Sequence, residues 1–287
     1  MEQARWLRNN LCISSPSCVE SAPANNSAID EHKALEMESI DTVVEAKDAH
    51  DSMQSNQMEQ NKVDLMRAFL EREDPTAKEV DNLMIRRFLR ARDLDVEKAS
   101  GLFLKYLKWR RAFVPDGSIS VSEIPNELAQ KKMFLQGLNK KGQPIAVVFG
   151  ARHFHTKGSL EEFKRFVVYI LDKISARMPA GQEKFVSIAD LKGWGYSNCD
   201  VRGYLGALSI LQDYYPERLG KLYIVHVPYI FMTAWKIVYP FIDSNTKKKI
   251  IFVENKKLRS TLLEDIDESQ IPEIYGGKLP LVPIEDS

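Results

Sequence analysis

Two charged groups stand at the borders of the most apolar stretch of this chain. Glu217 and its neighbour Arg218 come just before a strand-like block, Leu222–Val227, and Lys249 ends a run of three lysines before a second block, Ile250–Val253. A lysine run is usually an exposed surface feature. A buried phosphate, however, needs cationic or amide donors, and buried sugar hydroxyls need an acceptor such as a carboxylate, because an unpaired polar group is costly to bury. These residues therefore suit a polar headgroup that carries a phosphate and hydroxyls.

The segment between the two strand-like blocks is apolar on all sides. A helix of that kind must be buried or must cover something apolar. We interpret it as a lid over a lipid, with Pro228 and the Pro240–Phe241 step as candidate hinge boundaries. The residues that we expect to form this gate and to line the cavity beneath it are Ile230, Phe231, Ala234, Trp235, Ile237, Val238 and Phe241.

Other candidate chemistry has less support. Gly193–Asn198 follows a strand and opens a helix, as a dinucleotide fingerprint does, but Asn198 replaces the third glycine. His153 and His155 lack a nearby third metal ligand. Asp190, at the end of a strand, suits a cap for the next loop better than a catalytic role, because no base or nucleophile accompanies it. We predict no catalytic residue, no metal and no cofactor, and we keep a nucleotide-binding enzyme as an alternative.

The composition is that of a globular chain with a large core. Of 287 residues, 44% are hydrophobic and 28% are charged, and the formal net charge is zero. Residues 1–60 hold 11 acidic and 4 basic residues, which leaves 29 acidic and 36 basic residues in the remainder. A mildly basic body suits an anionic surface or ligand, whereas tight nucleic-acid binding needs a dense basic stripe.

Cysteine use and hydropathy indicate a cytoplasmic protein. The three cysteines have neither disulfide-framework nor zinc-ligand spacing, which fits a reducing compartment. No apolar run reaches 18 residues, so we predict no transmembrane helix. Contact with a membrane would then be transient and peripheral.

The order of elements predicts an α/β fold with a helical module before it. We expect a disordered acidic tail over residues 1–60, a helical subdomain over 61–115, an α/β domain over 120–280 and a C-terminal tail over 281–287. Strands that alternate with helices imply crossover connections and a largely parallel sheet. Ser159 and Glu162 form a capping-box sequence at the start of one of these helices.

Several blocks of the chain resemble one known family. They are Asp190–Gly193, Tyr214–Tyr223, Pro240–Asp243 and Ile274–Gly277, preceded by Phe88–Arg92 in the helical module. Over about residues 62–280 the chain resembles the CRAL-TRIO lipid-binding family, in particular its phosphatidylinositol-transfer branch. The resemblance implies a mixed, largely parallel sheet that floors an apolar cavity, closed by a mobile gate helix at about Tyr229–Asp243.

The resemblance also implies roles for individual residues. Glu217 and Lys249 match the acid and the lysine of the inositol-phosphate signature. Further headgroup-side positions are matched by Arg218, Thr246 and Arg92. Asp93 stands where relatives often have a basic residue. On the strand before Asp190, Ser187 retains one of two hydroxyl positions for phosphatidylcholine, whereas Phe185 replaces the other.

From this resemblance we expect a monomeric protein that is not an enzyme. It would bind phosphatidylinositol and a second hydrophobic lipid, and exchange them between membranes or present them to lipid-modifying enzymes. Its partners would be the phospholipid and, transiently, a membrane surface, with no nucleic acid. The alternative is a carrier for another small hydrophobic ligand, such as a sterol, a tocopherol-like molecule or a retinoid.

Overall fold

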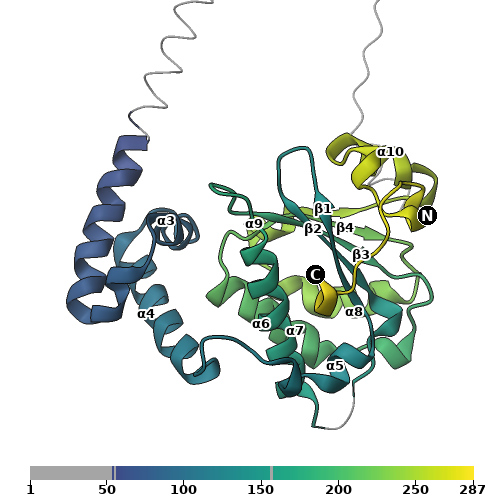
Figure 1. Cartoon of the computed structure of the whole chain (residues 1–287), viewed down its shortest axis with the longest axis horizontal. Helices are drawn as coiled ribbons and strands as arrows, with labels where there is room; N and C mark the ends of the chain where they lie inside the picture. The colour runs from purple at the N-terminus through teal and green to yellow at the C-terminus, as the bar shows by residue number, and fades with distance from the viewer. Residues whose placement is uncertain (1–53, 55, 156–157) are drawn as a thin grey trace, which may run out of the picture. The chain divides into compact units, whose positions relative to one another are not determined.

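A five-stranded mixed sheet is the centre of the computed structural model, which describes residues 54, 56–155 and 158–287. The strands lie in the order β1-β2-β3-β4-β5. β1 and β2 form an antiparallel hairpin, and the pairs β2–β3, β3–β4 and β4–β5 are parallel (Figure 1). The prediction of a largely parallel sheet is confirmed. The strands are β1 Met133–Leu138, β2 Pro144–Phe149, β3 Phe185–Asp190, β4 Leu219–Val225 and β5 Ile250–Phe252.

Both faces of the sheet are covered, which explains why its strands read as nearly continuous apolar runs. On β3, Val186 and Ile188 belong to the core cluster on one face. Phe185, Ser187 and Ala189 alternate with them and line a cavity on the other face. This alternation follows from the two-residue period of a strand.

Two helices, α6 (Leu160–Ala176) and α7 (Val201–Tyr214), run side by side over the cavity face (Figure 1). The predicted capping box at the start of α6 is wrong, because Ser159 gives no side-chain cap. The Glu162 carboxylate instead accepts hydrogen bonds from the backbone N–H and the side-chain amide of Asn126, at 2.7 and 2.9 Å. It therefore joins α6 to the short helix α5 (Pro125–Ala129).

The opposite face carries the C-terminal part of the chain. Tyr275 donates from its hydroxyl to Asp190 Oδ2 at 2.9 Å and so fixes this segment to the end of β3. The elements on this face are η6 Asn255–Lys257, α10 Leu258–Asp265, η7 Glu268–Gln270 and η8 Glu273–Tyr275. The end of the chain, predicted as a tail, instead packs against α6. Ile284 of η9 (Ile284–Asp286) is 1% exposed in the same core cluster as Phe166, and Lys173 of α6 donates to its carbonyl at 3.0 Å.

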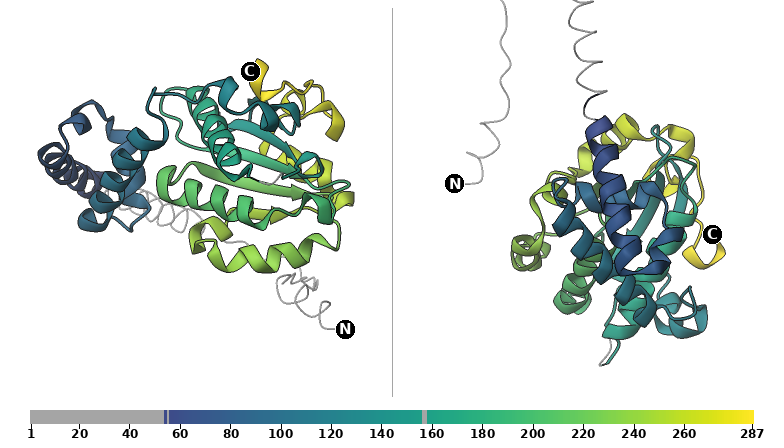
Figure 2. Two further views of the ribbon diagram at one scale, coloured as in Figure 1. Left: turned by 90° about the horizontal axis from the view of Figure 1, so that it is seen from below. Right: turned by 90° about the vertical axis from the view of Figure 1, so that its left-hand side faces the viewer.

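A helical module precedes the sheet and lies within the same compact unit, residues 57–287. It consists of a helix over residues 56–73, η1 (Pro75–Glu79), α3 (Asn82–Arg90) and α4 (Val96–Phe113), which gather to one side of the strands in the left view of Figure 2. The first helix covers residues 56–60, which the prediction gave to the tail. The remainder of the predicted tail, residues 1–53 and 55, lies outside the described residues.

Aspartates and one glutamate position this module. The side chains of Asp81 and Asp95 cap α3 and α4 by accepting backbone N–H bonds. Glu183, just before β3, accepts from Arg87 at 3.4 Å and from Arg90 at 3.0 Å. These contacts hold the C-terminal end of α3 against the segment that precedes β3.

The connections around the sheet contain the remaining short elements. The segment from Pro228 onward forms α8 only over Phe231–Val238, followed by η5 (Tyr239–Phe241), so the predicted single gate helix is in fact two pieces. Pro240 lies in the first turn of η5, where its missing N–H costs nothing. Within the described residues, no helix is long and apolar enough to cross a membrane. The other short elements are η2 Val121–Glu123, η3 Gly150–Arg152, η4 Tyr196–Asn198 and α9 Ser244–Lys247.

Candidate functional site

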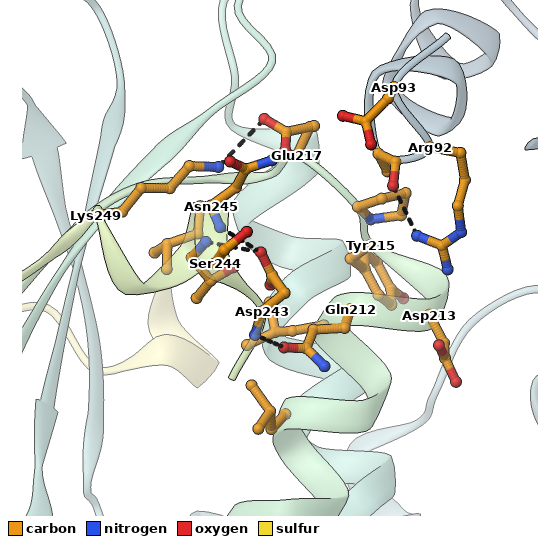
Figure 3. A pocket seen from close by; sticks show the side chains of 16 residues that line it. Arg92, Asp93, Gln212, Asp213, Tyr215, Glu217, Asp243, Ser244, Asn245 and Lys249 are labelled. Atoms are coloured by element: carbon orange, nitrogen blue, oxygen red, sulfur yellow. Dashed lines mark hydrogen bonds and ion pairs between the residues drawn. The ribbon is translucent and has the colours of Figure 1, made fainter. Parts of the chain in front are cut away.

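A polar cavity of about 340 Å³ lies at the edge of the sheet where β4 and β5 begin (Figure 3). The two strands are parallel, so the residues that precede them meet at the same edge. Glu217 comes from the turn before β4 and Lys249 from the residue before β5. Arg92, from the turn after α3, and Thr246, from α9, also line it.

Glu217 and Lys249 form an ion pair in this cavity. Lys249 Nζ lies 3.2 Å from Glu217 Oε2, and both side chains are 18% exposed. Lys184 Nζ lies 3.6 Å from the same oxygen. Glu217 has a backbone φ of +57°, in the left-handed region that non-glycine residues rarely adopt. Such an uncommon backbone conformation often marks a functional site.

Asp243 forms the hydrogen bonds that hold the neighbouring wall of the polar cavity. Its carboxylate accepts the backbone N–H groups of Asn245 and Thr246 at 2.9 and 2.8 Å, and its backbone N–H donates to Gln212 at 2.9 Å. Burial works against the charged form of Asp243, but the hydrogen bonds from Thr246 and Asn245 hold its pKa below the ordinary value. The cap presents the Thr246 side of α9 to the cavity.

Arg218 does not join the cavity, although it neighbours Glu217. Its Nη1 donates to the Glu183 carbonyl and contacts Met178 Sδ, both at 3.2 Å. Burial, together with the nearby charge of Arg87, lowers the pKa of Arg218 to about 10. Arg218 therefore contacts the segment that precedes β3 and does not lie at the headgroup position that we predicted for it.

The prediction also left out several polar residues of the cavity. Gln212, Ser244 and Asn245 line it beside the predicted residues. The sequence Asp243–Thr246 carried a usable signal, because an aspartate before Ser, Asn and Thr is typical of a helix N-terminus.

A second cavity, of about 390 Å³ and almost entirely apolar, lies between the sheet and helices α6, α7 and α8. Phe185 and Ser187 of β3, which we predicted to line the cavity, both line it. Leu208 and Leu211 of α7 line this apolar cavity and the polar cavity alike, so the two cavities adjoin along α7.

One face of α8 closes the apolar cavity. Phe231, Ala234, Trp235 and Val238 line it, at the i, i+3, i+4 and i+7 positions that share a helix face. The other predicted lining residues of the gate lie elsewhere. Ile230 packs against the cluster that contains Trp194 and Ile224, while Ile237 and Phe241 are 48% and 58% exposed on the outside.

A buried charged cluster forms part of the cavity wall. Lys132 Nζ donates to Glu127 at 2.5 Å, to Gln130 at 2.8 Å and to His153 Nδ1 at 2.7 Å, and His153 Nε2 lies 3.2 Å from Asp200. Burial, and then the charge of Lys132, lower the pKa of His153 to about 4, so its ring is neutral at pH 7. All three donors of Lys132 are used inside the cluster, which therefore offers no ammonium group to a ligand.

The sites considered for other chemistry have structural roles. Asp190 Oδ1 accepts the backbone N–H of Lys192 at 2.8 Å, as the cap interpretation predicts, and also pairs with His226 Nδ1 at 2.9 Å. The Gly193 turn does not open a helix directly, because η4 intervenes and α7 begins only at Val201. The setting of a dinucleotide fingerprint is thus missing at this turn.

An apolar cavity closed by a short helix adjoins a polar, charged cavity, an arrangement that has room for a ligand with an apolar body and one polar end. The chain belongs to the CRAL/TRIO domain family, whose pattern matches residues 128–277. The Sec14 cytosolic factor of Schizosaccharomyces pombe is 31% identical over 239 residues, which cover 77% of this chain and 83% of that protein. The SEC14 cytosolic factor of Kluyveromyces lactis is 29% identical over 216 residues, covering 69% and 71%.

A solved structure supports the fold as well. The crystal structure of Sfh5 superposes with a TM-score of 0.55 at 18% identity and covers 70% of this chain and 82% of that chain. The family resemblance is therefore confirmed, and it supports lipid binding and transfer as the class of activity.

Proposed function

We propose that this protein binds one phosphatidylinositol molecule and exchanges it between membranes. The headgroup occupies the polar cavity and the acyl chains occupy the apolar cavity. The observation that carries this proposal is that Leu208 and Leu211 line both cavities, so that the polar cavity with its Glu217–Lys249 pair adjoins the apolar one.

The polar groups match the headgroup. Lys249 and the guanidinium of Arg92 supply cationic donors for the phosphodiester. The Glu217 carboxylate accepts hydrogen bonds from ring hydroxyls, and the Thr246 hydroxyl adds a further partner. Because the pair is partly buried, its charges are screened less by salt than those of a fully exposed pair.

Exchange requires the acyl chains to leave one apolar environment for another without meeting water. Each buried methylene is worth about 0.8 kcal/mol in either environment, so the transfer is nearly balanced and opening sets the barrier. The exposed outer face of the gate, with Tyr229, Ile237 and Phe241, suits transient contact with a membrane from the cytoplasm. The protein acts as a monomer in this mechanism, and no bond is made or broken.

The bound lipids of the protein purified from cells test this proposal by native mass spectrometry. We expect phosphatidylinositol in the wild type and its loss in Glu217→Ala and Lys249→Ala. Glu254 and Lys257 form a comparable but exposed ion pair at 3.7 Å, so Glu254→Ala and Lys257→Ala serve as matched controls that keep the lipid. Unchanged loading in the Glu217 and Lys249 variants would refute the headgroup assignment, and a sterol, tocopherol-like or retinoid mass would support the alternative carrier.

A further inference from the structure

The wall of the polar cavity carries more carboxylates than cations. Two cationic side chains and four acidic ones line it, an excess of two negative charges, in a cavity proposed above to receive an anionic headgroup. The cations are Arg92 and Lys249, and the acids are Asp93, Asp213, Glu217 and Asp243.

Three of the four carboxylates already have partners. Asp213 pairs with Lys105 at 2.9 Å, and Glu217 pairs with Lys249 at 3.2 Å. Asp243 accepts two backbone N–H groups of α9. Each of these carboxylates thus has a positive or N–H partner within the protein, and Glu217 keeps lone pairs for the ring hydroxyls.

Asp93 is different. Within the described part of the chain, its carboxylate makes neither a hydrogen bond nor an ion pair, although it follows Arg92 directly. Figure 3 shows the Asp93 carboxylate on the cavity side of the turn, facing the wall that holds Glu217. It is thus an acceptor and a negative charge that only a ligand, water or salt can satisfy.

The turn holds Asp93 in place. Asp93 and Leu94 have φ angles of +51° and +60°, which are uncommon for side-chain-bearing residues. The backbone N–H of Leu94 donates to Leu89 at 2.8 Å, and Lys62 Nζ donates to the Leu94 carbonyl at 2.9 Å. The backbone of the turn is thus fixed from both sides, so the Asp93 carboxylate can change its position only by rotation about its own side-chain bonds.

We propose that Asp93 makes the polar cavity selective for an inositol headgroup whose ring hydroxyls carry no further phosphate. This inference rests on the proposed function. A ring hydroxyl can donate to the Asp93 carboxylate, whereas a phosphate monoester accepts only and carries a charge of about −1.5 to −2 at pH 7. The Asp93 carboxylate and a phosphate monoester would repel each other without a counterion. Asp93 therefore favours the unphosphorylated inositol ring and disfavours the phosphorylated one.

The test is a competition for loading. The protein is incubated with phosphatidylcholine vesicles that contain equal amounts of phosphatidylinositol and phosphatidylinositol 4-phosphate, and the ratio of the two bound lipids is read by native mass spectrometry. We expect Asp93→Lys to lower the preference of the wild type by about tenfold, equivalent to about 1.4 kcal/mol. The isosteric Asp93→Asn removes the charge and replaces one acceptor oxygen with an amide donor, and it should lower the preference by a smaller factor.

Glu97 provides matched controls. It is an exposed carboxylate in the first turn of α4 and does not line the polar cavity. Glu97→Lys and Glu97→Gln change the net charge by the same amounts and should leave the lipid ratio unchanged. Because Asp93 is exposed, the difference between Asp93→Lys and Glu97→Lys should shrink as salt is added.

The outcomes separate the two proposals. If the wild type loads phosphatidylinositol but its preference is the same in Asp93→Asn, in Asp93→Lys and in the Glu97 variants, the selectivity inference is overturned and the proposed function stands. If Glu97→Lys changes the ratio as much as Asp93→Lys, general surface charge is responsible and the inference is also overturned. If the wild type loads neither inositol lipid, the proposed function fails and the inference fails with it.

Discussion

Acid should destabilise this fold through one buried histidine. His153 is 5% exposed and lies between the Lys132 ammonium, at 2.7 Å, and the Asp200 carboxylate, at 3.2 Å. Burial, and then the charge of Lys132, lower its pKa from 6.5 to about 4. The folded state therefore holds the ring neutral at pH values where the unfolded chain binds a proton.

The sign and size of the effect follow from linkage. Because the folded pKa is the lower one, the stabilisation is fully present above pH 6.5 and is lost as the pH falls toward about 4. Each pH unit in that window is worth about 1.4 kcal/mol, so the whole window removes about 3 kcal/mol of unfolding free energy.

Urea unfolding at a series of pH values measures this loss. His153→Gln removes the titrating ring and should flatten the dependence on pH in this window. His155 is an exposed histidine two residues away, and His155→Gln should retain the steep dependence of the wild type. If the wild type and His153→Gln lose stability in parallel between about pH 6.5 and 4, the assignment of the effect to His153 is refuted.

Four further substitutions test the packing of the fold and of its apolar cavity. Lys132→Met leaves the buried carboxylate of Glu127 unpaired and should lower the unfolding free energy by about 3–5 kcal/mol. The double variant Glu127→Leu with Lys132→Met should recover most of this loss. If the single and the double variant lose the same unfolding free energy, the buried pair is not the cause. In Gly277→Ala, a Cβ would lie 2.1 Å from the Ile271 carbonyl oxygen, so we expect about 1–3 kcal/mol of destabilisation by the same measurement, and an unchanged midpoint would contradict the close approach. Ala189→Leu adds three carbons to the cavity floor, each worth about 0.8 kcal/mol of burial that the lipid then loses. Bound lipid measured by mass spectrometry should fall, and full loading would show that the acyl chains lie elsewhere.

The sheet and its helices could be predicted because their periodicities are physical consequences of burial. The alternation of strands and helices implied parallel pairing. Glu217 and Lys249 were brought together by their places just before strand-like blocks and by the family resemblance, and in the structure their side chains are in contact.

Side-chain direction was harder to predict. Glu217 and Arg218 are adjacent, yet one faces the polar cavity and the other lies against Glu183. The two side chains point in different directions from a left-handed backbone at Glu217, and a glutamate gives no sign in the sequence of a positive φ. Similarly, the predicted capping box of Ser159 and Glu162 does not form, because the Glu162 carboxylate bonds to Asn126, which is far away in the sequence.

The sequence of the gate segment contains a helical spacing that our prediction did not use. Treating the segment as apolar all round placed Ile237 and Phe241 in the cavity, whereas both lie on the outside. Helical spacing alone selects Phe231, Trp235 and Val238 as one face, and these residues do line the cavity. The periodicity was therefore more informative than the mean hydropathy of the segment.

The most direct test of the account is to locate a bound lipid within the two adjoining cavities. Phosphatidylinositol with a photoreactive group near the end of one acyl chain is loaded from vesicles, activated, and mapped by peptide mass spectrometry. We expect labelled residues among the lining of the apolar cavity, such as Phe166, Ile170 and Trp235, and we expect Lys249→Ala to reduce this labelling. Labelling confined to the outer surface, or labelling of the cavity that is indifferent to Lys249, would contradict the claim that one lipid occupies both cavities.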